Sequence, residues 1–108
     1  MDFDNIKILE SDIELSHFAR AIAIPVRISM IRLIIAQGTW VSHDVFSVIG
    51  LGPVTIERHL KAMVHLGLIK EKHYNRKTSY NINEEVFLKM AGEFTELFDF
   101  FKRMHPKE

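Results

Sequence analysis

The segment GLGPVTIERHLKAMVHLGLI, residues 50–69, contains a helix with clear start and stop signals. Proline is favoured at the first position of a helix and glycine just beyond its end, so Pro53 and Gly67 predict the two boundaries. Between them, apolar residues recur at helical spacing and define one buried stripe: Ile56, Leu60, Met63 and Val64. The pattern predicts an amphipathic helix from about Pro53 to Leu66.

A shorter helix is expected immediately before this one. Ser42 suits an N-cap, Asp44 is favourable near the positive end of a helix, and Gly50-Leu51-Gly52 ends the helix after about two turns. Four apolar residues are expected on its buried side: Val45, Phe46, Val48 and Ile49. Two short helices joined by a glycine-containing turn are typical of a helix-turn-helix.

Two further helices precede this pair. Helical spacing of Ile13, His17 or Phe18, Ala21 and Ile22 predicts the first, over residues 12–22. Pro25 opens the second, and Gly38 is a natural stop. Its expected apolar face is made of Ile28, Ile31, Leu33, Ile34 and Ile35.

A β-hairpin and a long helix follow the helix-turn-helix. Residues 69–74 and 78–82 read as two short strands around Asn75-Arg76-Lys77, where Asn75 can adopt the left-handed conformation of a turn. A helix from Asn83 or Glu84 to about Met104 completes the chain. We therefore predict a mainly α (α+β) fold, a winged helix-turn-helix of about five helices with a two-stranded hairpin wing, as a single domain over residues 1–108.

Composition excludes several classes of protein. The chain has 108 residues, 47% of them hydrophobic, and no cysteine, which rules out disulfides, thiolate metal sites and a cysteine nucleophile. No phosphate-binding glycine loop, zinc-protease motif or triad spacing is present, so we expect no enzyme and no cofactor. The acidic start MDFDNIKILESD does not resemble a secretory signal, and no apolar run reaches the ~20 residues of a membrane span. We expect a cytoplasmic protein with no membrane segment.

Charge is unevenly distributed although the formal net charge is zero. Residues 53–77 carry six basic and two acidic side chains, whereas residues 1–20 carry five acidic and two basic ones. A solvated face is the simplest interpretation of such a block. A local basic surface is also the electrostatic signature of nucleic-acid binding, which a neutral protein can achieve.

The outer face of the helix at residues 53–66 suits the major groove of duplex DNA. If the apolar stripe faces the core, six residues are left on or near the outside: Val54, Thr55, Glu57, Arg58, His59 and Lys61. Arg58 can bind guanine or clamp a phosphate, and Lys61 can reach phosphate. At the hairpin tip, Arg76 and Lys77 are expected to contact phosphate or the minor groove. Surface solubility for Arg58 and Lys61, and packing or capping for His59, are the alternatives.

From Phe18 to Ile82 the sequence resembles the ArsR-type family of winged-helix transcriptional regulators. The matching segments are FARAIAIPVRISMIRLI, VIGLGPVTIERHLKAMVHLGLI and KEKHYNRKTSYNI. Within them, the family's motifs fall in the right order at Pro25-Val26-Arg27, Arg58-His59-Leu60-Lys61 and Gly67-Leu68-Ile69. The resemblance implies a homodimeric repressor whose DNA binding is released by an effector.

Two departures from the family concern function. Glu57 replaces the serine or threonine that is common in the middle of the recognition helix, and Ile24 replaces a histidine before the proline-arginine motif. A carboxylate is repelled by phosphates, although it can accept a hydrogen bond from cytosine N4. The operator preference is therefore expected to be unusual.

Metal sensing, found in many relatives, is not expected here. The stretch Val41-Ser42-His43-Asp44 stands where relatives carry a cysteine pair, and it has no thiolate. On the last helix, Glu93, Glu96 and Asp99 have only His105 nearby. Sensor-grade transition-metal sites usually need several nitrogen or sulfur ligands. We expect no metal site.

The last helix carries an apolar seam at spacings of three and four residues. Its members are Phe87, Met90, Phe94, Leu97, Phe101 and Met104, and Ala91 and Phe98 widen the stripe. The seam is either a core-facing stripe or, as we expect, a dimer interface, since Phe100 adds an apolar residue that a monomer would expose. The resemblance implies that the first and last helices pair across a two-fold axis. A small apolar effector in this interface is a further possibility.

Two functions therefore compete. The first is a sequence-specific regulator of transcription that binds duplex DNA as a homodimer on a palindromic operator. The second is a winged-helix module for protein–protein interaction, which the zero net charge and Glu57 favour slightly. The basic hairpin together with Arg58 and Lys61 favours the first more strongly.

Overall fold

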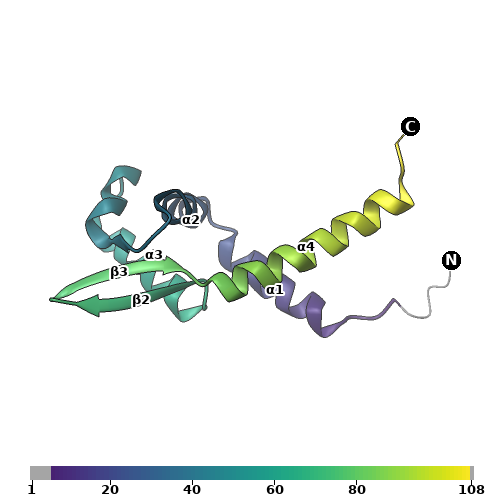
Figure 1. Cartoon of the computed structure of the whole chain (residues 1–108), viewed down its shortest axis with the longest axis horizontal. Coiled ribbons are helices and arrows are strands. Elements are labelled where there is room, and N and C mark those ends of the chain that lie inside the picture. The colour runs from purple at the N-terminus through teal and green to yellow at the C-terminus, as the bar shows by residue number, and fades with distance from the viewer. Residues whose placement is uncertain (1–5, 108) are drawn as a thin grey trace.

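The helices and strands of this chain form an elongated molecule, 58 × 31 × 22 Å. Its structure, a computed structural model, describes residues 6–107. Figure 1 shows the wing projecting at one end and the last helix extending toward the other. In chain order the elements are α1 (Glu10–Ile22), α2 (Pro25–Gln37), β1 (Val41–Ser42), the 3₁₀ helix η1 (His43–Ile49), α3 (Pro53–His65), β2 (Ile69–Tyr74), β3 (Lys77–Ile82) and α4 (Glu84–Met104).

The helix-turn-helix consists of η1 and α3, joined by Gly50-Leu51-Gly52. Pro53 is the first residue of α3, as its fixed φ angle favours, and the helix ends at His65. Gly50 and Gly67 both have positive φ, 88° and 78°, a conformation that glycine adopts without a Cβ clash. These two residues let the chain turn sharply on either side of α3.

One core holds these elements together. It contains residues from every helix and from all three strands: Phe18, Ala21, Met30, Ile31, Ile34, Val41, Phe46, Ile56, Leu60, Met63, Leu68, Ile69, Tyr80 and Met90. The predicted stripe of α3 is confirmed, since Ile56, Leu60 and Met63 are all buried. Phe46 of η1 is fully buried and packs edge-on against the Tyr80 ring, with centroids 6.1 Å apart. This contact fixes the helix-turn-helix on the sheet.

Four apolar residues expected in the core are exposed instead. Val48 of η1 is 73% exposed, and Ile13, Ile28 and Ile35 also face outward. In α2 the buried stripe is shifted to Met30, Ile31 and Ile34, because this helix is apolar on nearly all sides and periodicity alone does not select a face. In the 3₁₀ geometry of η1, residues three apart rather than four align on one side, which changes the buried set.

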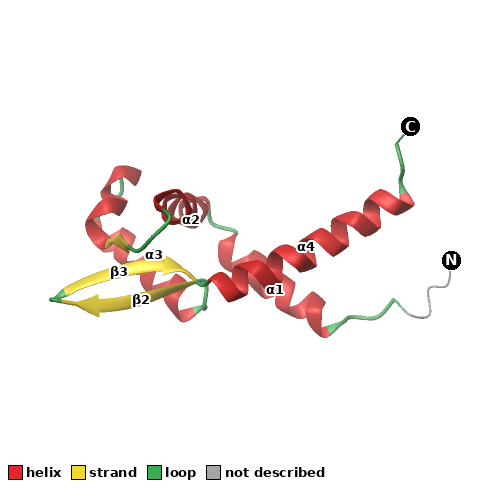
Figure 2. Cartoon of the chain, in the orientation of Figure 1, coloured by secondary structure: helices red, strands yellow, loops and turns green. Residues whose placement is uncertain are grey.

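The predicted two-stranded hairpin wing is confirmed as β2 and β3, and a short third strand, β1, extends the sheet. β1 pairs antiparallel with β3 through Val41–Tyr80 and Ser42–Ser79. β2 and β3 pair over six residues each, from Ile69–Ile82 to Tyr74–Lys77 (Figure 2). The strand order is β1-β3-β2. The sheet therefore ties the start of the helix-turn-helix to the wing.

The turn of the wing is also shorter than predicted. Lys77 was expected in the turn but is the first residue of β3, and the turn consists of Asn75 and Arg76 alone. Both have positive φ, 50° and 64°, which is the geometry of a type I′ hairpin turn. Asparagine tolerates this conformation well, whereas arginine adopts it at a cost.

Helices α1 and α4 lie side by side and extend away from the helix-turn-helix (Figure 1). Phe18 of α1 packs edge-on against Phe87 and Phe94 of α4, with ring centroids 5.4 and 6.3 Å apart. Lys89 of α4 forms an ion pair with Glu14 of α1. None of the helices within residues 6–107 is long and apolar enough to cross a membrane.

Candidate nucleic-acid interface

The exposed face of α3 is the first part of the candidate interface. Since Ile56, Leu60 and Met63 face the core, the side chains of Glu57, Arg58 and Lys61 are left in solvent. Val54, on the first turn, is 71% exposed. Thr55 is half-buried beside it. The face thus offers charged groups and one apolar side chain for contact.

Glu57 and Lys61 interact along this face. Lys61 Nζ lies 3.3 Å from Glu57 Oε1, one helical turn away, and both side chains are largely exposed. Such an i, i+4 pair stabilises a helix by only about 0.3–0.5 kcal/mol. Its main consequence here is local, since it places a cation directly beside the carboxylate.

His59 lies toward the interior of the helical region rather than on the most exposed part of α3. Its ring is half-buried, and its Nδ1 accepts a hydrogen bond from Arg27 Nε over 3.5 Å. Arg27 also donates from Nη1 to the carbonyl oxygen of Ala21 at the end of α1, over 3.0 Å. The arginine of the Pro-Val-Arg motif therefore links α1 to α3. A direct role for His59 in DNA contact stays a prediction.

The wing carries the second set of basic side chains. Lys70, Lys72, Arg76 and Lys77 are all exposed, with Arg76 in the turn itself. Lys72 Nζ lies 4.5 Å from the centroid of the Trp40 ring, a cation–π contact that ties β2 to the segment before β1. His73 Nδ1 is 2.9 Å from Thr78 Oγ1 across the hairpin. The first contact connects the wing to the segment before β1, and the second lies within the hairpin.

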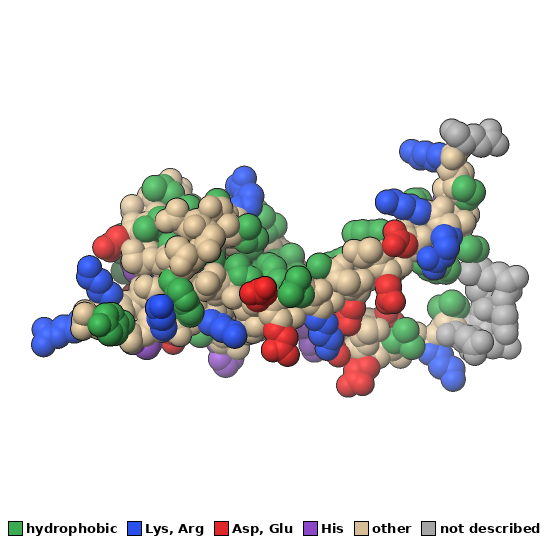
Figure 3. All heavy atoms as spheres, in the orientation of Figure 1, with side chains coloured by type: hydrophobic (Ala, Val, Ile, Leu, Met, Phe, Trp, Pro, Cys, Tyr) green, Lys and Arg blue, Asp and Glu red, His purple; other side chains and the backbone are tan. Residues whose placement is uncertain are grey.

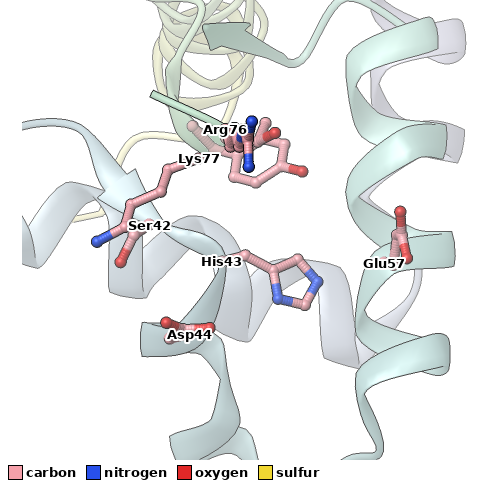
Figure 4. Close-up of a pocket in the computed structure, with 8 residues that line it drawn as sticks. Ser42, His43, Asp44, Glu57, Arg76 and Lys77 are labelled. Atoms are coloured by element: carbon pink, nitrogen blue, oxygen red, sulfur yellow. The ribbon is translucent and has the colours of Figure 1, made fainter. Parts of the chain in front are cut away.

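An open cleft separates α3 from the wing (Figure 4). Its volume is about 360 Å³, and its lining combines side chains from β1, η1, α3 and the wing: Ser42, His43, Asp44, Glu57, Arg76, Lys77, Thr78 and Tyr80. Figure 4 shows the His43 ring directed toward the helix that bears Glu57. The structure thus brings Glu57, Arg76 and Lys77, three residues selected from sequence, to the edges of one depression.

Ser42, His43 and Tyr80 are residues of this cleft that sequence reasoning did not connect with DNA binding. Ser42 was interpreted only as a helix cap, and in the structure its side chain makes no capping hydrogen bond. Its place is set by the pairing of β1 with β3, which two residues of sequence do not reveal. The position of Ser42 and His43 at the start of the helix-turn-helix is the one signal that could have drawn attention to them.

Tyr80 forms part of the cleft wall from within the sheet. Burial raises the pKa of its phenol above the usual value, and the negative charges of Glu71 and Glu57 raise it further. The hydroxyl therefore stays protonated at neutral pH and remains a hydrogen-bond donor.

Acidic side chains are concentrated away from the wing. Figure 3 shows basic side chains at the wing end and also at the far end of the molecule, whereas most of the visible acidic ones lie over α1 and α4. Glu10, Asp12 and Glu14 stand on α1, and Glu84 and Glu85 begin α4. The face that could approach a polyanion is thus the end formed by α3 and the wing.

The seam of α4 divides into two parts. Met90 is 5% exposed and Phe87 and Phe94 pack against the core, so this half serves as a core-facing stripe. The second half is exposed and surrounds a hollow of about 600 Å³ lined by Leu97, Phe98, Phe100, Phe101, Met104 and His105. Phe101 is 61% exposed. An apolar surface of this kind is typical of an interaction site.

Solved structures of transcriptional regulators share this fold. HlyU from Vibrio cholerae superposes with a TM-score of 0.67 at 14% identity, covering 93% of this chain and 100% of HlyU. An ArsR-like transcriptional regulator from Rhodococcus sp. RHA1 superposes with a TM-score of 0.74 at 16% identity. The match covers 91% of this chain and 89% of the Rhodococcus chain. A third structure is the homodimeric winged helix-turn-helix DNA-binding domain of Mb0332 from Mycobacterium bovis, a possible ArsR-family transcriptional regulator. It superposes with a TM-score of 0.63 at 18% identity, and the match covers 99% of this chain and 94% of the Mb0332 domain.

Neither a protein-family model nor a curated protein matches the sequence. The structural comparisons nevertheless confirm the predicted fold, because each similarity extends over most of both chains. The chain has the winged helix-turn-helix fold seen in ArsR-type transcriptional regulators, as the motifs at Pro25–Arg27 and Arg58–Lys61 indicated.

Proposed function

We propose that this chain is a sequence-specific DNA-binding transcriptional regulator that acts as a homodimer in the cytoplasm, without catalytic activity. One observation carries the proposal: the exposed face of α3 and the basic tip of the wing border the same open cleft, at the end of the molecule away from the acidic helices. A duplex laid across this end would meet both surfaces at once.

In this docking, α3 enters the major groove and the wing lies along the neighbouring backbone. Arg58 can form two parallel hydrogen bonds to guanine or clamp a phosphate, and Lys61 can reach a phosphate. Val54 can contact a thymine methyl group, while Thr55 can donate to a phosphate. Arg76 and Lys77 at the wing tip complete the set through phosphate or minor-groove contacts.

The exposed half of the α4 seam supports dimerisation. A second copy of the chain would cover Leu97, Phe98, Phe101 and Met104, which one protomer leaves in solvent. Two-fold symmetry would then place the recognition helices ~34 Å apart, about one turn of DNA, and would require a palindromic operator. A dimer bound at a promoter would repress transcription by blocking access to it. The family resemblance implies that an effector then releases the dimer from DNA.

DNA binding can be tested with labelled duplexes enriched from a random pool. We expect affinity to fall steeply with salt, because each phosphate neutralised contributes roughly −0.9 to the log–log slope. Arg58→Ala should weaken binding about tenfold, since it removes a charged contact to DNA. The matched control is Arg103→Ala on α4, which removes the same charge at the opposite end and should have little effect.

Absence of binding at low salt, or equal effects of Arg58→Ala and Arg103→Ala, would contradict the proposal. It would favour the second candidate, a winged-helix module for protein–protein interaction. The ion pair between Lys61 and Glu57 is the observation on that side, because it reduces the positive charge of α3.

A further inference from the structure

Glu57 is the only acidic residue of α3, and it stands at the centre of the exposed face. Val54 lies one turn before it and Lys61 one turn after it. The side chain borders the cleft toward the wing, where Arg76, Lys77 and Asp44 are the other charged groups. A carboxylate in this position needs an explanation, because the proposed partner is itself a polyanion.

The contribution of Glu57 to the stability of α3 is too small to explain the carboxylate. The Glu57–Lys61 pair is exposed, with 72% of the Lys61 side chain and 51% of the Glu57 side chain accessible, so solvent screens it strongly. The pair instead makes the carboxylate tolerable near phosphates, since the ammonium group 3.3 Å away offsets its charge. Arg76 and Lys77 add two positive charges to the lining of the same cleft, against the one negative charge of Asp44.

An ionised carboxylate is a hydrogen-bond acceptor only. In the major groove, guanine presents two acceptors, and thymine presents the O4 acceptor and a methyl group. Neither base offers a donor, so neither can form a hydrogen bond with the Glu57 carboxylate. Adenine offers its N6 amino group directly beside the N7 acceptor. Cytosine offers the N4 amino group without an adjacent acceptor, and it is therefore the base edge that fits a carboxylate best.

We infer that Glu57 determines operator specificity by accepting a hydrogen bond from the N4 amino group of a cytosine, one in each half-site. This inference rests on the proposed DNA-binding function and names the base that α3 reads at its centre. Lys61 is then a positioning residue, which holds the carboxylate on the outer face and screens it from the backbone.

The conservative variant Glu57→Gln gives a sharp test. Glutamine has nearly the same shape, but its amide carries a donor and an acceptor and pairs with N6 and N7 of adenine. Binding sites are selected from a randomised duplex pool with the wild-type chain and with Glu57→Gln, and their affinities are measured on matched duplexes. Glu96→Gln, an exposed glutamate on α4, is the control for the loss of one negative charge.

We expect the wild-type motif to contain a fixed cytosine in each half-site, whose replacement by adenine weakens binding about tenfold. Glu57→Gln should lose or reverse this preference at that position alone, favouring adenine, and Glu96→Gln should retain the wild-type motif. Identical motifs for the wild type and Glu57→Gln would overturn the role of Glu57 and leave the DNA-binding function standing. A wild-type chain that binds no DNA or enriches no motif would overturn the proposed function itself.

Discussion

Arg27 connects three helices through two hydrogen bonds. It belongs to α2, donates to the carbonyl oxygen of Ala21 at the end of α1, and donates to His59 of α3. The guanidinium group can do this because its donors are fixed in a planar fork, which a lysine does not offer. The orientation of α3 thus depends on a side chain outside the helix-turn-helix.

We expect Arg27→Ala to lower the free energy of unfolding by about 1–2 kcal/mol, since hydrogen bonds from a charged, half-buried donor are lost and their acceptors are left unpaired. Urea unfolding followed by the fluorescence of Trp40, the single tryptophan, measures the change. Arg32→Ala, an exposed arginine on the same helix, is the matched control and should change stability by less than about 0.5 kcal/mol. Equal losses of unfolding free energy in the two variants would show that the hydrogen bonds of Arg27 do not stabilise the fold.

Tyr80 should ionise above the usual pH of a tyrosine phenol, because burial and the nearby glutamates raise its pKa. In the unfolded chain the same phenol loses its proton near pH ~10. The unfolded state therefore binds fewer protons above that pH, and stability should fall as pH rises from there toward the folded pKa. Tyr80→Phe should remove this part of the alkaline dependence. The phenolate absorbance that Tyr80→Phe removes isolates the titration of Tyr80, and its appearance at the pH usual for an exposed phenol would contradict the expectation.

The wing turn shows how an element can combine binding with strain. Arg76 adopts a left-handed conformation in a type I′ turn that favours glycine at this position. We expect Arg76→Gly to raise the free energy of unfolding by about 0.5–1 kcal/mol and to weaken DNA binding at the same time. Arg76→Ala, which removes the charge but keeps the strain, is the control and should weaken binding without the gain in stability. A Gly variant no more stable than the Ala variant would contradict this reading.

The elements that were predicted well are those with strong local signals. Pro53, Gly67 and the Ile56–Leu60–Met63 stripe fixed α3 to within one residue of its observed end. β1 was missed because two residues carry no periodicity, and its pairing with β3 is a long-range contact. The exposed face of α3 was predicted from its pattern, but the cleft was not, because Ser42 and His43 reach Arg76 and Lys77 only through the sheet.

At the scale of the whole molecule, α4 has a buried half and an exposed half. We expect the double variant Leu97→Glu/Phe101→Glu to convert a dimer to a monomer, because charges would replace the apolar contacts of the exposed half. Sedimentation velocity measures the change, and circular dichroism checks that the helices persist. Val48→Glu, at an exposed apolar position on η1, should leave the dimer intact. A wild-type chain that is monomeric at micromolar concentration would refute the interface.

The arrangement of the molecule separates these two surfaces. The wing and α3 lie at one end, and the exposed half of α4 lies toward the other (Figure 1). A dimer formed through α4 would therefore leave both recognition helices free to bind. Dimerisation and DNA binding should consequently be separable by mutation, with loss of the dimer weakening operator affinity through the loss of one half-site.

The most direct test of DNA binding through this face follows the backbone amide NMR signals of the chain while a duplex from the selected pool is added. We expect the largest changes in residues 54–61 of α3, at Ser42 and His43, and in residues 70–77 of the wing. Residues 28–36 of α2, which lie outside the candidate interface, should change little and serve as the internal reference. Changes confined to α2 or α4, with the signals of α3 and the wing unmoved, would contradict DNA binding through this face.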